Sequence, residues 1–440
     1  MMPLDPLTVT AGMFLSMLVL LLLGTPLTWS LTVVGVASAY WLWGSNALEM
    51  LVVSTYGVMD TYVLVALPLF IFMGLVLQRS GITDALFDMV HKLMGGVHGG
   101  LGIGTVVICA LIAAMAGVSG AATVSLGVIA LPAMLKRGYD KRLATGTIMA
   151  GGALGFLIPP SVVMIVYAFL ARESVGQLFA AGLVPGLMLA AIYSVYIAVR
   201  CRLNPELGPA IAAEERVNAL GKIKALKALI LPGGLITLVL GLIIGGVTSP
   251  TEASAVGAGG ALLCAFVHRN LTWDVLRYAL LETTKIMGMM MWVMLAAVFF
   301  SKIYIGLGAG ALVANLVAET GLSPMMILLV MLASYFVLGM FLDDFAIIFI
   351  TIPLYIPVIT ALGFDPVWFA VLFILSMQSA YLTPPFGYNL FYMRAVAPPS
   401  VTTNDLYRAA LPFIALQLIG LALVVSFPGI ALWLPRAIFN

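Results

Sequence analysis

The chain has 440 residues, of which 63% are hydrophobic and only 9% are charged. This balance excludes a water-soluble globular domain, because apolar runs of about 20 residues, long enough to cross a bilayer, recur throughout the chain. The net charge of +2 is too small to indicate a nucleic-acid partner, and the three cysteines lack the spacing of a disulfide framework or a metal site. No Lys or Arg precedes Arg79, so no cleavable signal peptide is expected. The composition predicts an all-α polytopic membrane protein.

The first half of the chain, residues 1–215, combines predicted spans with shorter helices. Residues 82–94 alternate apolar with charged side chains at helical spacing, which is typical of an arm at the membrane interface. Two apolar segments within residues 101–135 are each too short to cross the bilayer and are predicted to form a re-entrant hairpin. A helix at residues 143–170 is expected to break at Pro159-Pro160. The other spans are predicted at residues 9–24, 25–43, 61–78 and 179–199, with a more polar connection at 45–60.

The second half, residues 216–440, repeats this order after a long polar loop at residues 200–227. A second hairpin is predicted at residues 324–357, and a second helix, residues 367–392, is broken at Pro384-Pro385. The other elements of this half are predicted spans at residues 229–247, 250–267, 286–305 and 409–434, an arm at 271–284 and a helical piece at 309–319. We therefore predict ten spans and two hairpins in the chain as a whole.

The two halves share a sequence repeat at a spacing of 225 residues. Each copy has a small or polar tip, an apolar return, a Gly-aromatic-Asp turn and a helix broken by Pro-Pro. Positions 132–167 contain seven identities with their counterparts: Pro132, Gly138, Asp140, Leu157, Pro159, Pro160 and Tyr167 match Pro357, Gly363, Asp365, Leu382, Pro384, Pro385 and Tyr392. Matched broken helices indicate the binding site of a secondary transporter, because opened backbone persists at membrane depth only where protein or a water-filled cavity satisfies it. The alternative is that the prolines and glycines serve helix packing alone.

Charge predicts the topology. If residues 200–227 lie in the cytoplasm, 17 of the 20 Lys and Arg residues are cytoplasmic and only Arg172, Lys302 and Arg436 are outside. The N- and C-termini are then predicted to be periplasmic. The Gly-aromatic-Asp turns of the two copies fall on opposite faces, so the repeats are predicted to be inverted, as in alternating-access carriers.

Enzyme motifs are nearly absent from the sequence. Residues 117–120 match the G-x-S-G of rhomboid-type intramembrane serine proteases, in which Ser119 would need a histidine base. The three histidines of the chain are His91, His98 and His268, and the last of these is predicted at a cytoplasmic end. We therefore predict that the chain is not an enzyme, with the protease as a remote alternative. Glu252 is predicted to be structural, in a capping box with Ser249.

The chain resembles the large membrane subunit of the tripartite ATP-independent periplasmic (TRAP) transporters over residues 22–435. The residues that carry the resemblance include Leu22-Leu-Gly-Thr-Pro26, Gly117-Val-Ser-Gly120, Leu131-Pro-Ala-Met-Leu-Lys-Arg-Gly-Tyr-Asp140, Ile158-Pro-Pro-Ser161, Ser249-Pro-Thr-Glu-Ala253, Gly339-Met-Phe-Leu-Asp343 and Leu382-Thr-Pro-Pro-Phe-Gly-Tyr-Asn-Leu-Phe391. The resemblance implies sodium-driven import of an organic anion, usually a carboxylate, by an elevator motion in a bacterial inner membrane. It also implies a periplasmic substrate-binding protein and a separate small membrane subunit, and we expect that subunit not to be fused to this chain. No cofactor other than Na⁺ as coupling ion is expected.

The repeat and the resemblance together predict two sodium sites between the hairpin tips and the helix breaks. The first would use Gly117, Ser119, Gly155, Pro159 and Ser161, and the second Asp343, Asp344, Thr383, Pro384 and Gly387. The substrate is predicted to contact Ser119, Gly120, Ser161, Thr383 and Asn389. Asp344 stands 225 residues after Ser119, so the second site has a carboxylate where the first has a hydroxyl. The alternatives to a carrier subunit are an autonomous ion-coupled carrier and a membrane scaffold without transport activity.

Overall fold

The structure is a computed structural model of the chain, and it describes residues 6–117, 119–210, 217–308, 321–385 and 387–439. Its regular structure is entirely helical in these ranges, which confirms the all-α part of the predicted fold. The helical piece predicted at 309–319 lies outside them. Within the described residues, the helical segments that are long and apolar enough to cross a membrane number seven: Tyr62–Arg79, Val175–Leu203, Leu220–Ile244, Pro250–Val267, Trp273–Gly306, Asp344–Ala361 and Thr403–Ser426. Several of the other predicted spans form helices too short to meet that test.

The first half follows the predicted order, and α5 spans the residues of the predicted arm. The polar connection at residues 45–60 is largely helical. The helices of the first half are α1 Pro6–Leu22, α2 Leu27–Trp43, α3 Asn46–Met59, η1 Tyr62–Val65, α4 Ala66–Arg79, α5 Ile82–Met94, α6 Gly100–Ala116, α7 Ser119–Lys136, α8 Lys141–Ala153, η2 Leu154–Phe156, α9 Val162–Ala171 and α10 Val175–Leu203.

The second half differs from the prediction in two places. The predicted arm at 271–284 and span at 286–305 are one 34-residue helix, because the polar residues between them stay helical and Lys285 pairs with Glu282 one turn away. The predicted span at 409–434 ends at Ser426, because Pro428 disfavours helical backbone at the preceding Phe427, whose φ of −128° lies outside the helix. The loop between the halves contains η3 Pro205–Leu207. The helices of the second half are α11 Ala219–Ala225, α12 Lys227–Ile244, α13 Pro250–Val267, α14 Trp273–Gly306, α16 Pro324–Leu338, α17 Asp344–Ala361, α18 Pro366–Ala380, α19 Tyr388–Val396, α20 Thr403–Ser426 and α21 Gly429–Phe439.

The Gly-aromatic-Asp turns have the same local structure in both halves. Gly138 and Gly363 adopt left-handed φ angles of 78° and 77°, which only glycine adopts freely. Asp140 then caps α8 by accepting from the amides of the second and third residues after it, and Asp365 caps α18 in the same way. Each turn thus reverses the chain and starts a broken helix.

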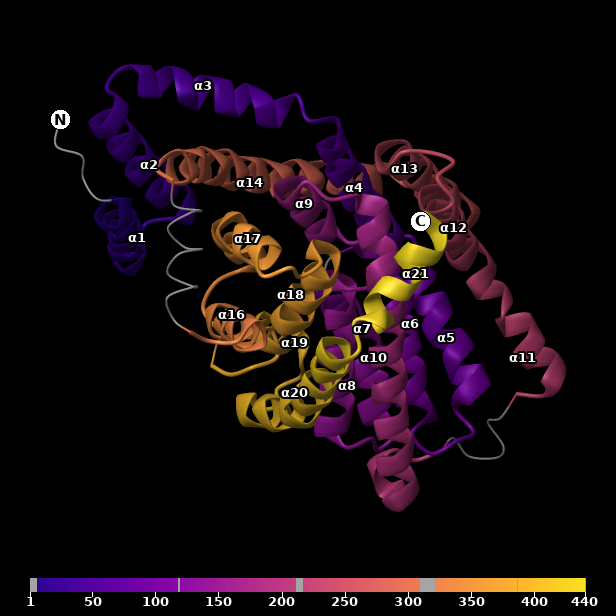
Figure 1. Cartoon of the computed structure of the whole chain (residues 1–440). Coiled ribbons are helices and arrows are strands. Elements are labelled where there is room, and N and C mark those ends of the chain that lie inside the picture. Colours follow the sequence, from indigo (N-terminus) through magenta and orange to yellow (C-terminus); the bar gives the residue numbers. More distant parts are fainter. Residues whose placement is uncertain (1–5, 118, 211–216, 309–320, 386, 440) are drawn as a thin grey trace.

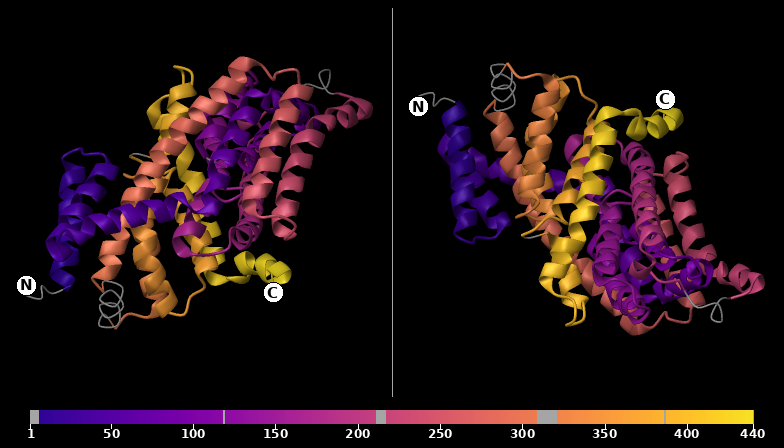
Figure 2. Two further views of the ribbon diagram at one scale, coloured as in Figure 1. Left: turned by 90° about the horizontal axis from the view of Figure 1, so that it is seen from above. Right: turned by 90° about the horizontal axis from the view of Figure 1, so that it is seen from below.

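The helices form a central group flanked by others. In Figure 1, α6–α10 and α16–α20 occupy the centre, and α3 and α14 lie across the top. Figure 2 shows α1 and α2 at one edge and α12 and α13 at the opposite edge. The N-terminal segments of the two broken helices, α8 and α18, are deeply enclosed. Helix α8 is buried from Leu143 to Ala153, and α18 is buried from Val367 to Ala380. The predicted capping box is confirmed at α13, where Ser249 and Glu252 bond reciprocally.

Candidate functional site

The first hairpin tip, between α6 and α7, closes onto the first helix break. Gly117 ends α6 with φ at 67°, and its carbonyl accepts a hydrogen bond from the Val162 amide at 3.1 Å. Ser161 begins α9, and its hydroxyl donates to the Phe156 carbonyl at 2.8 Å, across the break. These bonds satisfy opened backbone from within the protein. Tip and break lie together, as predicted, and neither carries a charged side chain.

The second hairpin tip, between α16 and α17, carries two acids and meets the second break through a tyrosine. The Asp343 carboxylate caps α17 by accepting from the Ala346 amide at 3.1 Å. The Tyr381 hydroxyl, at the C-terminal end of α18, donates to the Asp344 carboxylate at 2.9 Å and accepts from the Asp344 amide at 2.9 Å. Tyr381 therefore links the second tip to the second break.

Among the residues that the structure describes, none places a cationic side chain in an ion pair with either of these half-buried acids. The ion pairs among the described residues lie elsewhere, between Lys92 and Asp88, Lys141 and Asp405, Arg142 and Asp405, and Lys285 and Glu282. An acid within an apolar segment, without a side-chain cation, is a candidate ligand for a bound cation. The second tip thus offers negative charge, whereas the first offers only backbone and hydroxyl dipoles.

The two breaks meet through residues that are 225 positions apart. The rings of Phe156 and Tyr381 pack edge to face, with centroids 4.8 Å apart. The Gln378 side-chain amide donates to the Ala153 carbonyl at 2.7 Å, which joins another pair of equivalent positions. Asn389 adds a bond from its side-chain amide to the Met149 carbonyl at 3.1 Å. Both of the first two contacts join positions that the sequence repeat aligns, so the two breaks face each other.

Each hairpin also packs against the broken helix of the other half. Helix α7 packs on α19, where a side chain added at Gly120 would collide with the Tyr392 ring. Helix α17 packs on α9. The Tyr167 hydroxyl of α9 also donates to the carbonyl of Pro366, the first residue of α18, at 2.8 Å, which joins the two broken helices. The hairpins and broken helices therefore form one interlocked unit.

The structure brings some of the predicted site residues together and separates others. Gly117 lies against the break that contains Gly155, Pro159 and Ser161, and a side chain added at Gly117 would lie 3.0 Å from the Pro160 carbonyl. The Thr383 hydroxyl donates instead to the Ser379 carbonyl at 2.8 Å, and no hydrogen bond among the described residues joins it to Asp343 or Asp344. Gly387, after Pro384, begins α19 without a side-chain cap. The side chain of Ser119 lies outside what the structure describes.

Two functional candidates were missed from the sequence. Tyr381 bonds Asp344. Gln378 is fully buried, and its side-chain oxygen has no hydrogen-bond partner among the described residues. Gln378 had a usable signal, because an amide within an apolar run that leads into a helix break is rare and costly in a membrane. Tyr381 had none, since tyrosines are common throughout this chain.

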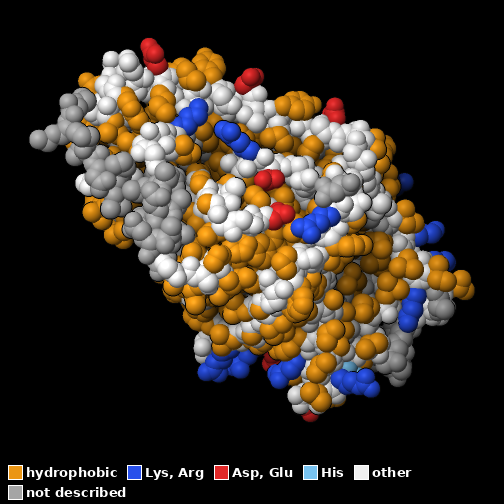
Figure 3. Space-filling model, viewed as in Figure 1, with side chains coloured by type: hydrophobic (Ala, Val, Ile, Leu, Met, Phe, Trp, Pro, Cys, Tyr) orange, Lys and Arg blue, Asp and Glu red, His pale blue; other side chains and the backbone are white. Residues whose placement is uncertain are grey.

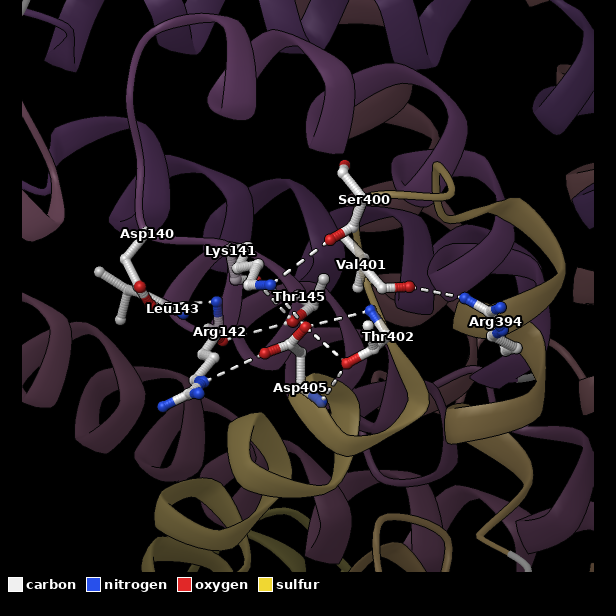
Figure 4. A network of polar contacts seen from close by, with 10 residues as sticks. All are labelled: Asp140, Lys141, Arg142, Leu143, Thr145, Arg394, Ser400, Val401, Thr402 and Asp405. Atoms are coloured by element: carbon white, nitrogen blue, oxygen red, sulfur yellow. Dashed lines mark hydrogen bonds and ion pairs between the residues drawn. The ribbon is translucent and has the colours of Figure 1, made fainter.

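A polar cluster joins the first broken helix to α20, away from the tips (Figure 4). The buried Asp405 carboxylate accepts from Lys141 at 2.6 Å, from Arg142 at 3.4 Å and from the Thr402 hydroxyl at 2.7 Å. The position equivalent to Lys141 in the second half is Pro366, so this cluster has no counterpart there. The two halves thus differ at their turns as well as at their tips.

Comparison with known proteins identifies the family. The family model of the tripartite ATP-independent periplasmic transporter, DctM component, matches residues 14–430. The chain belongs to this family. It is 34% identical to the C4-dicarboxylate TRAP transporter large permease protein DctM of Pseudomonas aeruginosa, over 90% of this chain and 91% of that one. It is 30% identical to the ectoine TRAP transporter large permease protein TeaC of Halomonas elongata, over 98% of this chain and all of that one.

Solved structures share the fold of this TRAP permease. The Alcanivorax borkumensis YdaH transporter superposes with a TM-score of 0.65 over 90% of this chain and 89% of that chain, at 17% identity. The chain is therefore a multi-pass membrane protein of a bacterial TRAP transporter. Its relatives are transporter permease subunits, not enzymes, which removes the serine-protease alternative.

Proposed function

We propose that this TRAP permease imports an organic anion, most simply a carboxylate, coupled to sodium and supplied by a periplasmic binding protein. The observation that carries the proposal is the pair of acids, Asp343 and Asp344, at a hairpin tip that meets a helix break without a side-chain cation. A bound Na⁺ would balance their charge. The second sodium site would then centre on Asp343 and Asp344, and the first on Gly117, Ser119 and the oxygens of residues 155–161.

The proposed site for the substrate anion lies at the two helix breaks, where helix N-termini face the centre of the molecule. Helix α9 begins at the first break, and α19 begins at the second break, where Gly387 supplies no side-chain cap. Helix N-termini carry partial positive charge, which favours a carboxylate without any buried Lys or Arg. Relatives named for C4-dicarboxylates and for sialic acid support an acidic substrate. The substrate would contact Ser119, Gly120, Ser161, Thr383 and Asn389.

The halves are proposed to be inverted repeats that work as an elevator. Adding 225 to the bounds of α7 gives those of α17, and α6, α8, α9 and α10 match α16, α18, α19 and α20 within three residues. Helices α1 and α2 match α12 and α13 within four residues. The interlocked hairpins and broken helices would move as one transport unit against a scaffold that includes α3 and α14. Two related halves could then expose one central site to each side in turn.

The orientation is proposed from charge. On the face drawn in Figure 3, Lys and Arg side chains gather along the lower edge, while the upper rim carries acidic ones. The positive-inside rule then assigns the lower edge to the cytoplasm of a bacterial inner membrane and the termini to the periplasm. The partners would be a small membrane subunit and the binding protein, which would dock on the outer face.

Uptake into proteoliposomes tests this function. The purified chain is reconstituted with the proposed small membrane subunit and binding protein, and uptake of candidate anions is measured with and without an inward sodium gradient. We expect uptake only when all partners and the gradient are present. Robust sodium-driven uptake by the chain alone would instead establish the autonomous carrier.

Cysteine labelling tests the inverted orientation independently of transport. A cysteine at Tyr139 should react only with reagent added from the cytoplasmic side, and one at Phe364 only with reagent from outside. Labelling of both positions from one side would refute the inverted repeat.

A further inference from the structure

A cavity of about 560 Å³ lies at the junction of the proposed scaffold and transport unit. Helices α3 and α14 form one wall, and the C-terminal end of α9 together with α17 forms the other. Its volume lies within the range of small-molecule sites in proteins. Polar lining comes from Ser54, Ser301, Arg172 and Lys302, and apolar lining from residues such as Phe169 and Pro353. We call this space the outer cavity.

Two cationic side chains line the outer cavity, one on each wall. Arg172 ends α9, and Lys302 belongs to α14. Both side chains are exposed, and neither forms an ion pair within the described part of the chain. They are also two of the three basic residues that charge assigns to the outside, the other being Arg436. On a face so poor in positive charge, two cations that line one cavity make a local anion-attracting field.

The cavity lies between the outer surface and the helix breaks. Arg172 follows Ser161 by 11 residues of mostly helical chain, which at 1.5 Å per residue is roughly 16 Å. Pro353 follows Asp344 by nine residues of α17, a rise of roughly 14 Å. The adjacent acid, Glu173, lines a separate cavity with Pro250 and Phe439, and its burial, with Asp365 nearby, raises its pKa. Its charge is therefore not among those that line the outer cavity.

We propose that the outer cavity is an entry site for the substrate anion, in which Arg172 and Lys302 receive a carboxylate before it reaches the breaks. This inference rests on the proposed function and adds a binding site on the substrate's path to the breaks. Because one cation belongs to each wall, an anion between them bridges the scaffold and the transport unit, and the site is complete only while these walls face each other. Without an anion, the two positive charges repel each other across the same junction.

Charge-selective labelling tests the site without transport. Ser301→Cys lines the cavity, and the three native cysteines are buried, so they remain in place. Rates are compared for two methanethiosulfonate reagents of similar size, one with a sulfonate and one with a trimethylammonium group, relative to the exposed control Ser323→Cys. We expect the ratio of anionic to cationic rates to be about tenfold higher at Ser301→Cys. At roughly 6 Å in water with physiological salt, each cation raises the anionic rate about 1.7-fold and lowers the cationic rate by the same factor, which is about threefold in the ratio.

Variants assign the selectivity to the two cations. Arg172→Gln and Lys302→Gln should each lower the ratio about threefold, whereas Lys302→Arg should retain it and Arg436→Gln should leave it unchanged. Succinate should slow labelling of Ser301→Cys by a neutral reagent in a saturable manner, and Lys302→Gln should abolish that protection. A ratio equal to that of the Ser323→Cys control would overturn the proposal.

Two further measurements separate the anion source and the role. If selectivity is present in phosphatidylcholine vesicles but lost when phosphatidylglycerol is added, a lipid headgroup occupies the cavity and the proposal is wrong.

In the complete transporter, Arg172→Gln and Lys302→Gln should each raise the KM for the substrate anion about threefold to tenfold, whereas Arg436→Gln should leave it unchanged. An unchanged KM in both variants overturns the entry role. Loss of sodium-driven uptake in the unaltered protein would instead overturn the proposed function, while the labelling result would stand.

Discussion

The two hairpin tips occupy equivalent places but carry different chemistry. At the first tip, Gly117 meets the break through a backbone hydrogen bond to Val162. At the second tip, Asp343 and Asp344 stand at the start of α17, and Asp344 meets the break through Tyr381. The first tip needs a particular backbone shape, whereas the second depends on side-chain charge. This difference indicates that a repeated architecture fixes where the tips lie, while local sequence decides what each can bind.

The largest expected effect comes from removing charge at the second tip. Asp344→Asn keeps the shape and the contact with Tyr381 but loses the full negative charge. A charge-assisted interaction contributes about 1.5–3 kcal/mol, so the sodium concentration for half-maximal uptake should rise by about tenfold or more. Sodium titration of uptake measures this change.

The matched control is Glu252→Gln, which removes a charge from the capping box of α13. It should leave the sodium dependence unaltered. Tyr381→Phe should fall between the two, because it removes both hydrogen bonds between the Tyr381 hydroxyl and Asp344 but retains the charge. Equal sodium curves for Asp344→Asn and Glu252→Gln would make Asp344 a solvated tip residue.

The second prediction concerns the backbone of the first tip. Gly117→Ala places a side chain at φ 67°, 3.0 Å from the Pro160 carbonyl, so the tip must strain or move. Left-handed backbone costs about 1–2 kcal/mol for a residue other than glycine. We expect severalfold slower uptake and a lower Tm. The control is Gly241→Ala within α12, where nothing lies near the added side chain, and it should be neutral or stabilising by up to about 1 kcal/mol.

The third prediction tests the contact between the breaks. Gln378→Leu removes the bond to the Ala153 carbonyl, so that buried carbonyl loses its side-chain donor. The cost is about 1–3 kcal/mol of folding free energy, measurable as a lower Tm. Gln177→Leu, near the start of α10, is the control and should change stability by less than about 0.5 kcal/mol. Identical thermal stability of the two variants would contradict a structural role for the contact at the centre.

The smallest effect is expected at the polar cluster of the first turn (Figure 4). Asp405→Asn weakens its contacts to Lys141 and Arg142, whose side chains are 41% and 43% exposed, so solvent screens much of the attraction. We expect a smaller fall in Tm than for Gln378→Leu, and one that shrinks further in high salt. Salt-independent destabilisation would show that the Thr402 cap, rather than the ion pairs, is what Asp405 provides.

The sequence by itself determined the helical class, the repeat spacing and most helix positions. Apolar runs, Pro-Pro breaks and caps such as Asp140 and Asp365 are local signals, because they depend on backbone donors and on neighbours a few residues away. The same reasoning failed at α14. A short polar stretch in the sequence is interpreted as the boundary between two helices, whereas in the structure it is part of one continuous helix that packs against α2 and α4.

Only the tertiary structure decided which residues meet. Three pairs of residues from different helices come together: Gln378 with Ala153, Tyr381 with Asp344, and Arg172 with Lys302 around one cavity. No periodicity encodes such pairs, since they arise where two related halves cross. The chain therefore specifies its elements locally, whereas its binding chemistry exists only where the two breaks and the two walls of the outer cavity come together.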